Sequence, residues 1–183
     1  LKQLDMDQLQ PLNPISPYGE SKKQAEEFCQ QFTDQNGIDL TILRFYTVYG
    51  PRQRPDEAFT KFIRLILNGK SISVYGDGNK ERDFTYVSDI VNGSLLAAEK
   101  GVGIYNLGTN HPVTVNHMIS TIEKLMEQKI QKEYVKSPIG DVQKTHADIS
   151  QAEKELGYFP KISFEEGVRN CINWCKETQN IAF

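Results

Sequence analysis

The stretch at residues 16–46 reads SPYGESKKQAEEFCQQFTDQNGIDLTILRFY and predicts a helix followed directly by a strand. Ser16 can accept hydrogen bonds from the free N–H groups of a helix start, and Pro17 suits the first helical position. Asn36 and Gly37 are typical of a helix end. Residues 38–46 are β-branched and aromatic, which indicates a largely buried strand. Apolar residues recur at helical spacing between the two ends of the helix, at Ala25, Phe28, Cys29 and Phe32.

The same alternation continues to the end of the chain. Residue patterns predict strands at 72–76, 82–87, 104–108 and 132–136, and helices at 57–68, 89–100 and 116–128. Two capping boxes predict further helices, one at Asp148 and Gln151 that ends at Gly157, and one at Ser163 and Glu166. Strands that alternate with helices indicate the α/β class.

Composition excludes several classes of function. The 183 residues hold 21 Lys and Arg against 24 Asp and Glu, a net charge of −3, so nucleic acid is not the expected partner. No stretch has the roughly 18 to 20 apolar residues of a membrane span. Three cysteines without a CxxC pair fit a reduced, cytoplasmic compartment, and the scattered histidines predict no metal site. The chain begins with Leu1, as expected of a piece of something longer.

Tyr18 and Lys22 form the most informative pair of residues. They are four positions apart on the predicted helix and continue the face of Ala25 and Cys29, while Lys23 points away. A nearby ammonium lowers the pKa of a phenol, which would give an acid/base for a sugar or alcohol hydroxyl. The alternative is an amphipathic helix whose lysine extends to solvent.

Ordered motifs decide between these alternatives. The motifs are NPISPYGESK at 13–22, LRFYTVYGPRQRPDEA at 43–58, ISVYGDG at 72–78, RDFTYVSDIVNG at 82–93, IYNLG at 104–108, GDV at 140–142, AD at 147–148 and LGYFP at 156–160. With these motifs in this order, the chain resembles the extended short-chain dehydrogenase/reductase family, in particular its NAD-dependent nucleotide-sugar epimerases and dehydratases. The resemblance covers about residues 12–176 and looks closest to UDP-sugar 4-epimerases, including those that act on UDP-glucuronate.

The resemblance implies a fold and a division into domains. The fold is the C-terminal part of an extended Rossmann-type protein with a doubly wound parallel sheet and a small mixed α/β substrate-binding domain. Residues 1–50 would be a remnant of the NAD-binding domain. Residues 51–183 would mainly form the nucleotide-sugar domain, with parts that return to the Rossmann sheet. The family's GxxGxxG turn is absent from the 183 residues, so an incomplete fragment, inactive alone, is expected.

The resemblance also assigns the cofactor end of the site. Tyr18 would be the catalytic acid/base for the sugar 4-hydroxyl while NAD accepts the C4 hydride. Lys22 would bind the nicotinamide ribose and lower the pKa of Tyr18. Phe45 would face the nicotinamide and Thr47 the sugar, although many relatives have Asn in place of Thr47.

The nucleotide end follows in the same way. Arg82 would meet the diphosphate of a UDP-sugar, and Asp141 the nucleoside ribose. Ser73, Val74 and Tyr75 would line the uracil. Without the family resemblance, the sequence would be interpreted here as a surface arginine, a Gly-Asp turn and a plain strand with one apolar side.

Arg54 lies in the loop that follows the sugar-facing turn. A guanidinium there could pair with a charged sugar group such as a C6 carboxylate, or it could lie in solvent.

Three functions remain open. The first is NAD-dependent 4-epimerisation of UDP-glucose/galactose or UDP-glucuronate/galacturonate by transient C4 oxidation. The second is a dehydratase or decarboxylase of the same family, and the third is a non-catalytic module that binds nucleotide sugars. The expected partners are a UDP-sugar and a second copy of the chain, as a homodimer or a self-associating fragment.

Overall fold

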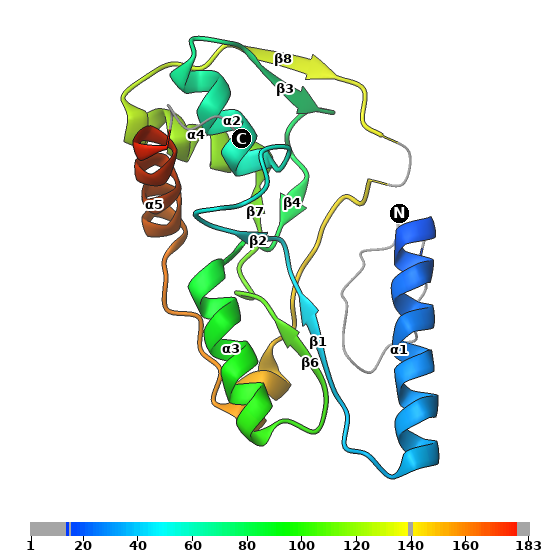
Figure 1. The fold of residues 1–183 in the computed structure, drawn as a ribbon. Helices are drawn as coiled ribbons and strands as arrows, with labels where there is room; N and C mark the ends of the chain where they lie inside the picture. Colours follow the sequence, from blue (N-terminus) through cyan, green and yellow to red (C-terminus); the bar gives the residue numbers. More distant parts are fainter. Residues whose placement is uncertain (1–13, 15, 139–140, 179–183) are drawn as a thin grey trace.

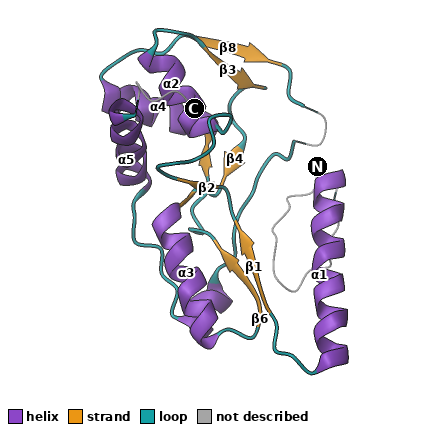
Figure 2. Ribbon diagram, in the orientation of Figure 1, coloured by secondary structure: helices purple, strands orange, loops and turns teal. Residues whose placement is uncertain are grey.

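The structure is a computed structural model that describes residues 14, 16–138 and 141–178 (Figure 1). Helices and strands alternate along it, as the sequence predicts (Figure 2). In chain order, the elements are α1 (Pro17–Asn36), β1 (Thr41–Phe45), β2 (Val48–Tyr49), α2 (Ala58–Leu67), β3 (Ile72–Tyr75), β4 (Glu81–Arg82), β5 (Thr85–Tyr86), α3 (Val87–Lys100), β6 (Gly103–Leu107), β7 (Val113–Thr114), α4 (Val115–Met126), β8 (Lys132–Val135), the π-helical turn η1 (Ala152–Leu156) and α5 (Phe164–Glu177).

The strands pair two by two, and most pairs are parallel. β1 lies beside β6 in a register that runs from Thr41 opposite Gly103 to Phe45 opposite Leu107. β2 pairs with β5 and β3 with β8, both parallel, whereas β4 and β7 are antiparallel. Parallel strands joined through helices confirm the α/β class. None of the helices in the described part of the chain is long and apolar enough to cross a membrane.

Most predicted helix ends are where the capping residues place them. The Ser16 hydroxyl accepts a hydrogen bond of 3.1 Å from the Gly19 N–H, and Gly37 ends α1 with φ 63°. Ser163 caps α5 through the Glu166 N–H. The short helix predicted between Asp148 and Gly157 is confirmed, since residues 150–156 are helical and Gly157 follows with φ 72°. The Asp148 carboxylate accepts from the Ser150 N–H at 2.9 Å.

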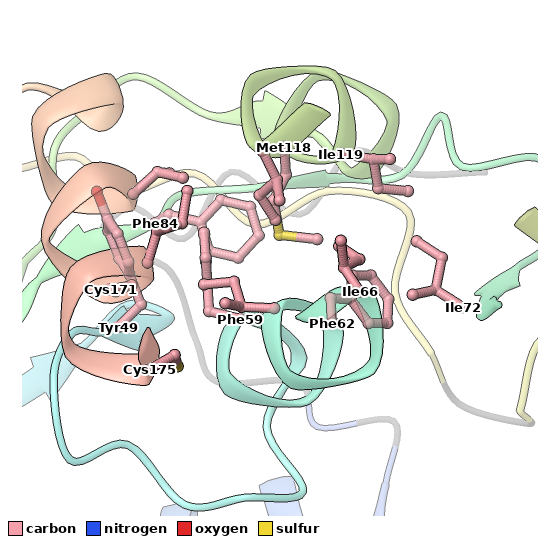
Figure 3. Packing of buried hydrophobic residues seen from close by; sticks show 14 of the residues in the cluster. Tyr49, Phe59, Phe62, Ile66, Ile72, Phe84, Met118, Ile119, Cys171 and Cys175 are labelled. Carbon is pink, nitrogen blue, oxygen red and sulfur yellow. The ribbon is translucent and has the colours of Figure 1, made fainter. Parts of the chain in front are cut away.

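The larger hydrophobic core lies between α2, α4 and α5, with β3 at its edge (Figure 3). Aromatic rings are stacked at its centre, with 4.4 Å between the ring centroids of Tyr49 and Phe59. Cys171 and Cys175 are buried on the inner face of α5, as their spacing predicts. Burial raises the pKa of Cys171 to about 12, so this thiol is protonated at neutral pH.

A second, smaller core lies where α3 and η1 cover β6. Close packing there depends on Gly93 of α3. A Cβ atom at this position would lie 2.8 Å from Leu107 and 3.0 Å from Tyr158, too close for any larger residue without a shift of the neighbours. Asp89 at the start of α3 accepts the N–H groups of Lys161 and Ile162, which ties the loop before α5 to this core.

The helix α1 exposes an apolar face, as the interpretation of the chain as a fragment predicts. None of its residues is buried, and its apolar stripe faces outward, with Tyr18 72%, Phe28 67% and Phe32 51% exposed. The opposite, polar face lies toward the rest of the chain, because the Glu26 carboxylate pairs with Arg44 of β1 through contacts of 2.6 and 3.0 Å. Lys23 is therefore half-buried rather than turned away. Figure 1 shows α1 at the right, with β1 between it and α3.

Candidate functional site

A carboxylate held between two cations marks the candidate site. One Asp141 oxygen lies 2.6 Å from Lys80 Nζ, and the other lies 2.6 Å from Arg82 Nη2. The exposed fractions of the three side chains are 8% for Lys80, 17% for Arg82 and 26% for Asp141. We call these three residues the Asp141 cluster. It carries one net positive charge at the protein surface, which suits an anionic ligand.

The turn between β3 and β4 positions the two cations. Gly76 and Gly78 adopt φ of 68° and 75°, which larger residues rarely adopt, and so reverse the chain. Within the turn, the Asp77 carboxylate accepts from the Asn79 N–H at 2.9 Å, and this bond is the main reason why the pKa of Asp77 is lowered. The chain then enters β4, where Arg82 pairs with Val113 of β7.

Ser137 joins the cluster to the predicted uracil strand. Its hydroxyl lies 2.9 Å from Lys80 Nζ, and a Cβ atom on Gly76 would lie 3.0 Å from that same hydroxyl oxygen. The end of β3 at Tyr75 therefore borders the Asp141 cluster. Residues that the sequence assigns to uracil, ribose and diphosphate are thus neighbours in space, although about 65 positions separate Tyr75 from Asp141.

The three predicted uracil residues do not face the same way. Ser73 and Tyr75 are exposed, whereas Val74 is fully buried in the larger core. Because side chains alternate along a strand, Val74 can offer a ligand only its backbone. Tyr75 lies opposite Val135 of β8, which is also exposed, so the two side chains form a small apolar surface beside the cluster.

Tyr18 and Lys22 lie next to each other on the exposed face of α1. Lys22 Nζ is 5.5 Å from the centre of the Tyr18 ring, as expected for residues four positions apart. Both side chains are exposed and open to a ligand. The structure thus keeps the ammonium beside the phenol, although the stripe to which they belong is not buried.

The turn after β1 carries the other predicted cofactor and sugar residues. Phe45 is 53% exposed at the carboxyl end of β1, beside the carboxyl end of β6. Ligands of parallel α/β sheets bind at this edge. Thr47 is half-buried, and its carbonyl accepts from the Thr85 N–H at 3.1 Å, which connects this turn to the strand that follows Arg82.

Arg54 forms its ion pairs outside the Asp141 cluster. Its guanidinium is 72% exposed and pairs with Glu57 at 2.8 Å and Asp56 at 3.4 Å, both in its own loop. It also lines a cavity of about 300 Å³ between this loop and the start of α3 at Val87. A carboxylate ligand would therefore compete with two acidic side chains for this guanidinium.

Sequence reasoning missed Lys80 and Ser137. A signal for Lys80 was present, because Lys80 and Arg82 are two positions apart in an extended segment and so point the same way. Ser137 had no comparable signal, since its role depends on how β8 lies beside β3. No cluster of metal-ligating side chains occurs among the residues that the structure covers.

Comparisons with known proteins give the site a context. UDP-glucuronate 4-epimerase of Thermodesulfobacterium geofontis is 41% identical over 166 residues, which cover 90% of this chain and 51% of that protein. A mutant UDP-glucuronic acid 4-epimerase from Bacillus cereus, solved with UDP-4-deoxy-4-fluoro-glucuronic acid and NAD, superposes with a TM-score of 0.92 at 34% identity, over 96% of this chain and 57% of that one.

UDP-glucose 4-epimerase from Thermotoga maritima, solved with UDP-glucose, superposes with a TM-score of 0.87 at 35% identity, over 91% of this chain and 55% of that one. The chain thus spans about half the length of the curated relatives it matches. A family model described as "NAD dependent epimerase/dehydratase family" matches residues 2–108. The fold, the ordered motifs and this match together show that the chain belongs to the NAD-dependent epimerase/dehydratase family.

Proposed function

We propose that this chain carries the Tyr/Lys pair and the nucleotide-sugar pocket of a UDP-sugar 4-epimerase that works with NAD. The observation that carries the proposal is the Asp141 cluster beside the end of β3. In this cluster, Asp141 can accept hydrogen bonds from a ribose and Arg82 can bind a diphosphate, next to the exposed ring of Tyr75. Support comes from the UDP-sugar 4-epimerases to which the chain is similar in sequence and structure.

The nucleotide is held by residues of the second half of the chain. Arg82 pairs with the diphosphate, because a guanidinium forms two parallel hydrogen bonds to phosphate oxygens. Asp141 accepts hydrogen bonds from the nucleoside ribose. Tyr75 packs against the uracil, while Ser73 and the backbone of Val74 provide polar contacts.

The reaction takes place at the other end of the substrate. A bound NAD, held at its nicotinamide end by Lys22 and Phe45, would supply the hydride acceptor and donor for C4 of the sugar. Tyr18 takes the proton from the 4-hydroxyl and gives it back, as a general base and then a general acid. Lys22 stabilises the phenolate and hydrogen-bonds the nicotinamide ribose. Phe45 and Thr47 position the ring and the sugar.

The residues on this chain suit only one end of NAD. Lys22 and the exposed ring of Phe45 fit the nicotinamide ribose end. A glycine-rich turn that would hold the pyrophosphate at a helix start does not occur in the 183 residues. We therefore infer that residues 1–50 belong to a cofactor domain completed by a further segment, and that the chain does not epimerise alone. The two separate hydrophobic cores support a division into two domains. In this division, residues 51–183 are mainly the substrate domain, although α3 and β6 pack against β1.

A chimera tests the catalytic role of Tyr18. This chain replaces the matched segment of the Thermodesulfobacterium geofontis epimerase, and Tyr18→Phe is introduced into the chimera. We expect a fall in turnover of roughly 10²- to 10⁴-fold, because the phenol hydroxyl is needed for proton transfer. UDP affinity should stay nearly unchanged, since the UDP contacts lie on other elements.

Ser21→Ala is the matched control, because Ser21 lies on the same helix and its hydroxyl bonds to the Tyr18 carbonyl. Wild-type turnover in the Tyr18→Phe chimera would contradict the proposed function.

We further propose that Arg54 favours an acidic sugar. The same chimera, with and without Arg54→Ala, is assayed with UDP-glucuronate and UDP-glucose. A guanidinium that pairs with a C6 carboxylate should give a loss of more than about tenfold for UDP-glucuronate alone. Equal losses for both substrates would show that Arg54 reads no carboxylate. Arg52→Ala, in the same loop, serves as the control.

A further inference from the structure

Lys80 is a nearly buried cation with no role in the proposed reaction. Its side chain is 8% exposed, and its ammonium contacts Asp141 at 2.6 Å and the Ser137 hydroxyl at 2.9 Å. Backbone bonds fix it further, because its carbonyl accepts from the Val115 N–H at the start of α4. A buried ammonium costs free energy unless it is paired, so its place beside Asp141 needs a reason.

The proposed nucleotide site makes two demands that conflict. Arg82 must turn toward the diphosphate, yet in the structure it holds one oxygen of Asp141. Asp141 must keep a fixed orientation to accept from the ribose, yet it would lose Arg82 as a partner at that moment. Lys80 holds the other oxygen and is too enclosed to follow the ligand.

Other charges near Lys80 are already paired. Glu81 lies beside it on β4 but pairs with Lys144 at 3.1 Å. Asp77 in the preceding turn is bound to Asn79. Asp141 is therefore the carboxylate that Lys80 holds in this part of the structure.

We propose that Lys80 is a positioning residue for nucleotide binding, which fixes the Asp141 carboxylate toward the ribose while Arg82 engages the diphosphate. The inference rests on the proposed function, because it takes the ligand to be a uridine nucleotide. It predicts that loss of Lys80 impairs recognition of the ribose hydroxyls in particular, rather than binding in general.

Two nucleotides separate these effects. UDP and 2′,3′-dideoxy-UDP are titrated by calorimetry into the wild-type chain and into Lys80→Met. The wild type should bind UDP more tightly by roughly 10- to 100-fold, the value of a hydrogen bond to a charged group. In Lys80→Met, the affinities for UDP and 2′,3′-dideoxy-UDP should differ by no more than about threefold. A merely structural role of Lys80 would weaken the binding of both nucleotides equally and leave the ratio of their affinities unchanged.

Lys144→Met is the matched control, since it removes a lysine that pairs with Glu81 of the same strand. It should leave the ratio of the two affinities unchanged. Circular dichroism checks that each variant is folded, and Lys80→Gln carries the same comparison if Lys80→Met does not fold. If a folded Lys80 variant keeps the wild-type ratio of UDP affinity to 2′,3′-dideoxy-UDP affinity, the inference is overturned and the proposed function is not. Failure of the wild-type chain to bind UDP overturns both the inference and the proposed function.

Discussion

The two ends of the chain contrast sharply in how they are held. The core between α2, α4 and α5 buries stacked aromatic rings and the thiols of Cys171 and Cys175. The helix α1 buries nothing, and a two-point ion pair between Glu26 and Arg44 attaches it to β1. Yet α1 carries the Tyr18–Lys22 pair. The catalytic candidates therefore lie on a helix without buried residues, whereas β3 of the proposed nucleotide site packs on the larger core.

This difference shows what each region needs. A hydrophobic core is complete within the chain, so its stability should not depend on any partner. The apolar stripe of α1 is exposed, so its full stability requires another surface. Three variants can break or sharpen this contrast.

Phe59→Ala should have the largest effect on stability. Phe59 is 1% exposed, stacks on Tyr49 and meets Phe84 edge-on at 5.0 Å. Loss of a buried phenylalanine ring leaves a cavity that costs about 3–5 kcal/mol. Urea unfolding followed by circular dichroism measures the change. A loss below 1 kcal/mol would mean that the core repacks around the gap.

Arg44→Met should have a smaller and local effect. Removal of the guanidinium deletes two hydrogen bonds to the Glu26 carboxylate, which are worth about 1.5–3 kcal/mol to the docking of α1. Hydrogen exchange should speed up in α1 and stay unchanged in α5. Arg169→Met is the control, because it breaks an exposed pair with Glu165 worth about 0.5 kcal/mol or less. Equal exchange in α1 before and after Arg44→Met would contradict the proposed attachment.

Phe28→Ser combined with Phe32→Ser should have the smallest effect on unfolding, within about 0.5 kcal/mol for each exposed site. Its effect should appear in self-association. Both rings lie on the exposed stripe, 67% and 51% exposed, and we expect that face to pair with a second copy. Sedimentation velocity should show dimers or larger species for the wild type and a shift toward monomer for the double variant. Identical sedimentation distributions for the wild type and the double variant would show that any self-association uses a surface other than this stripe.

Local signals predicted local structure well. Ser16 and Gly37 mark the ends of α1 as expected, and the i,i+4 spacing of Cys171 and Cys175 correctly placed both in the core. The helix ends and the cysteine positions depend on residues within a few positions of one another. The α/β class followed from the order of elements along the chain, and the parallel pairing from the family resemblance.

Predictions failed where a distant segment decides the outcome. Lys23 was predicted to point away, but the pairing of Glu26 with Arg44 turns this polar side of α1 toward β1. The Asp141 cluster shows the same limit, because β3 and β8 must pair before Ser137 can reach Lys80. The roles of the predicted site residues in binding and catalysis stay predictions.

Asp83 has a consequence for the order of events in folding. Its buried carboxylate accepts four hydrogen bonds, from the N–H and hydroxyl of Thr109 and from the N–H groups of Asn110 and Ala147. These donors lie 26, 27 and 64 positions further along the chain. Such long closures are slow, because chain entropy is lost before any contact repays it. Since Arg82 precedes Asp83, we expect the nucleotide site to form only after β6 and the segment before η1 have come together beside β4. The larger core needs a closure that is longer still, because the Tyr49 hydroxyl bonds the Phe164 carbonyl 115 positions away.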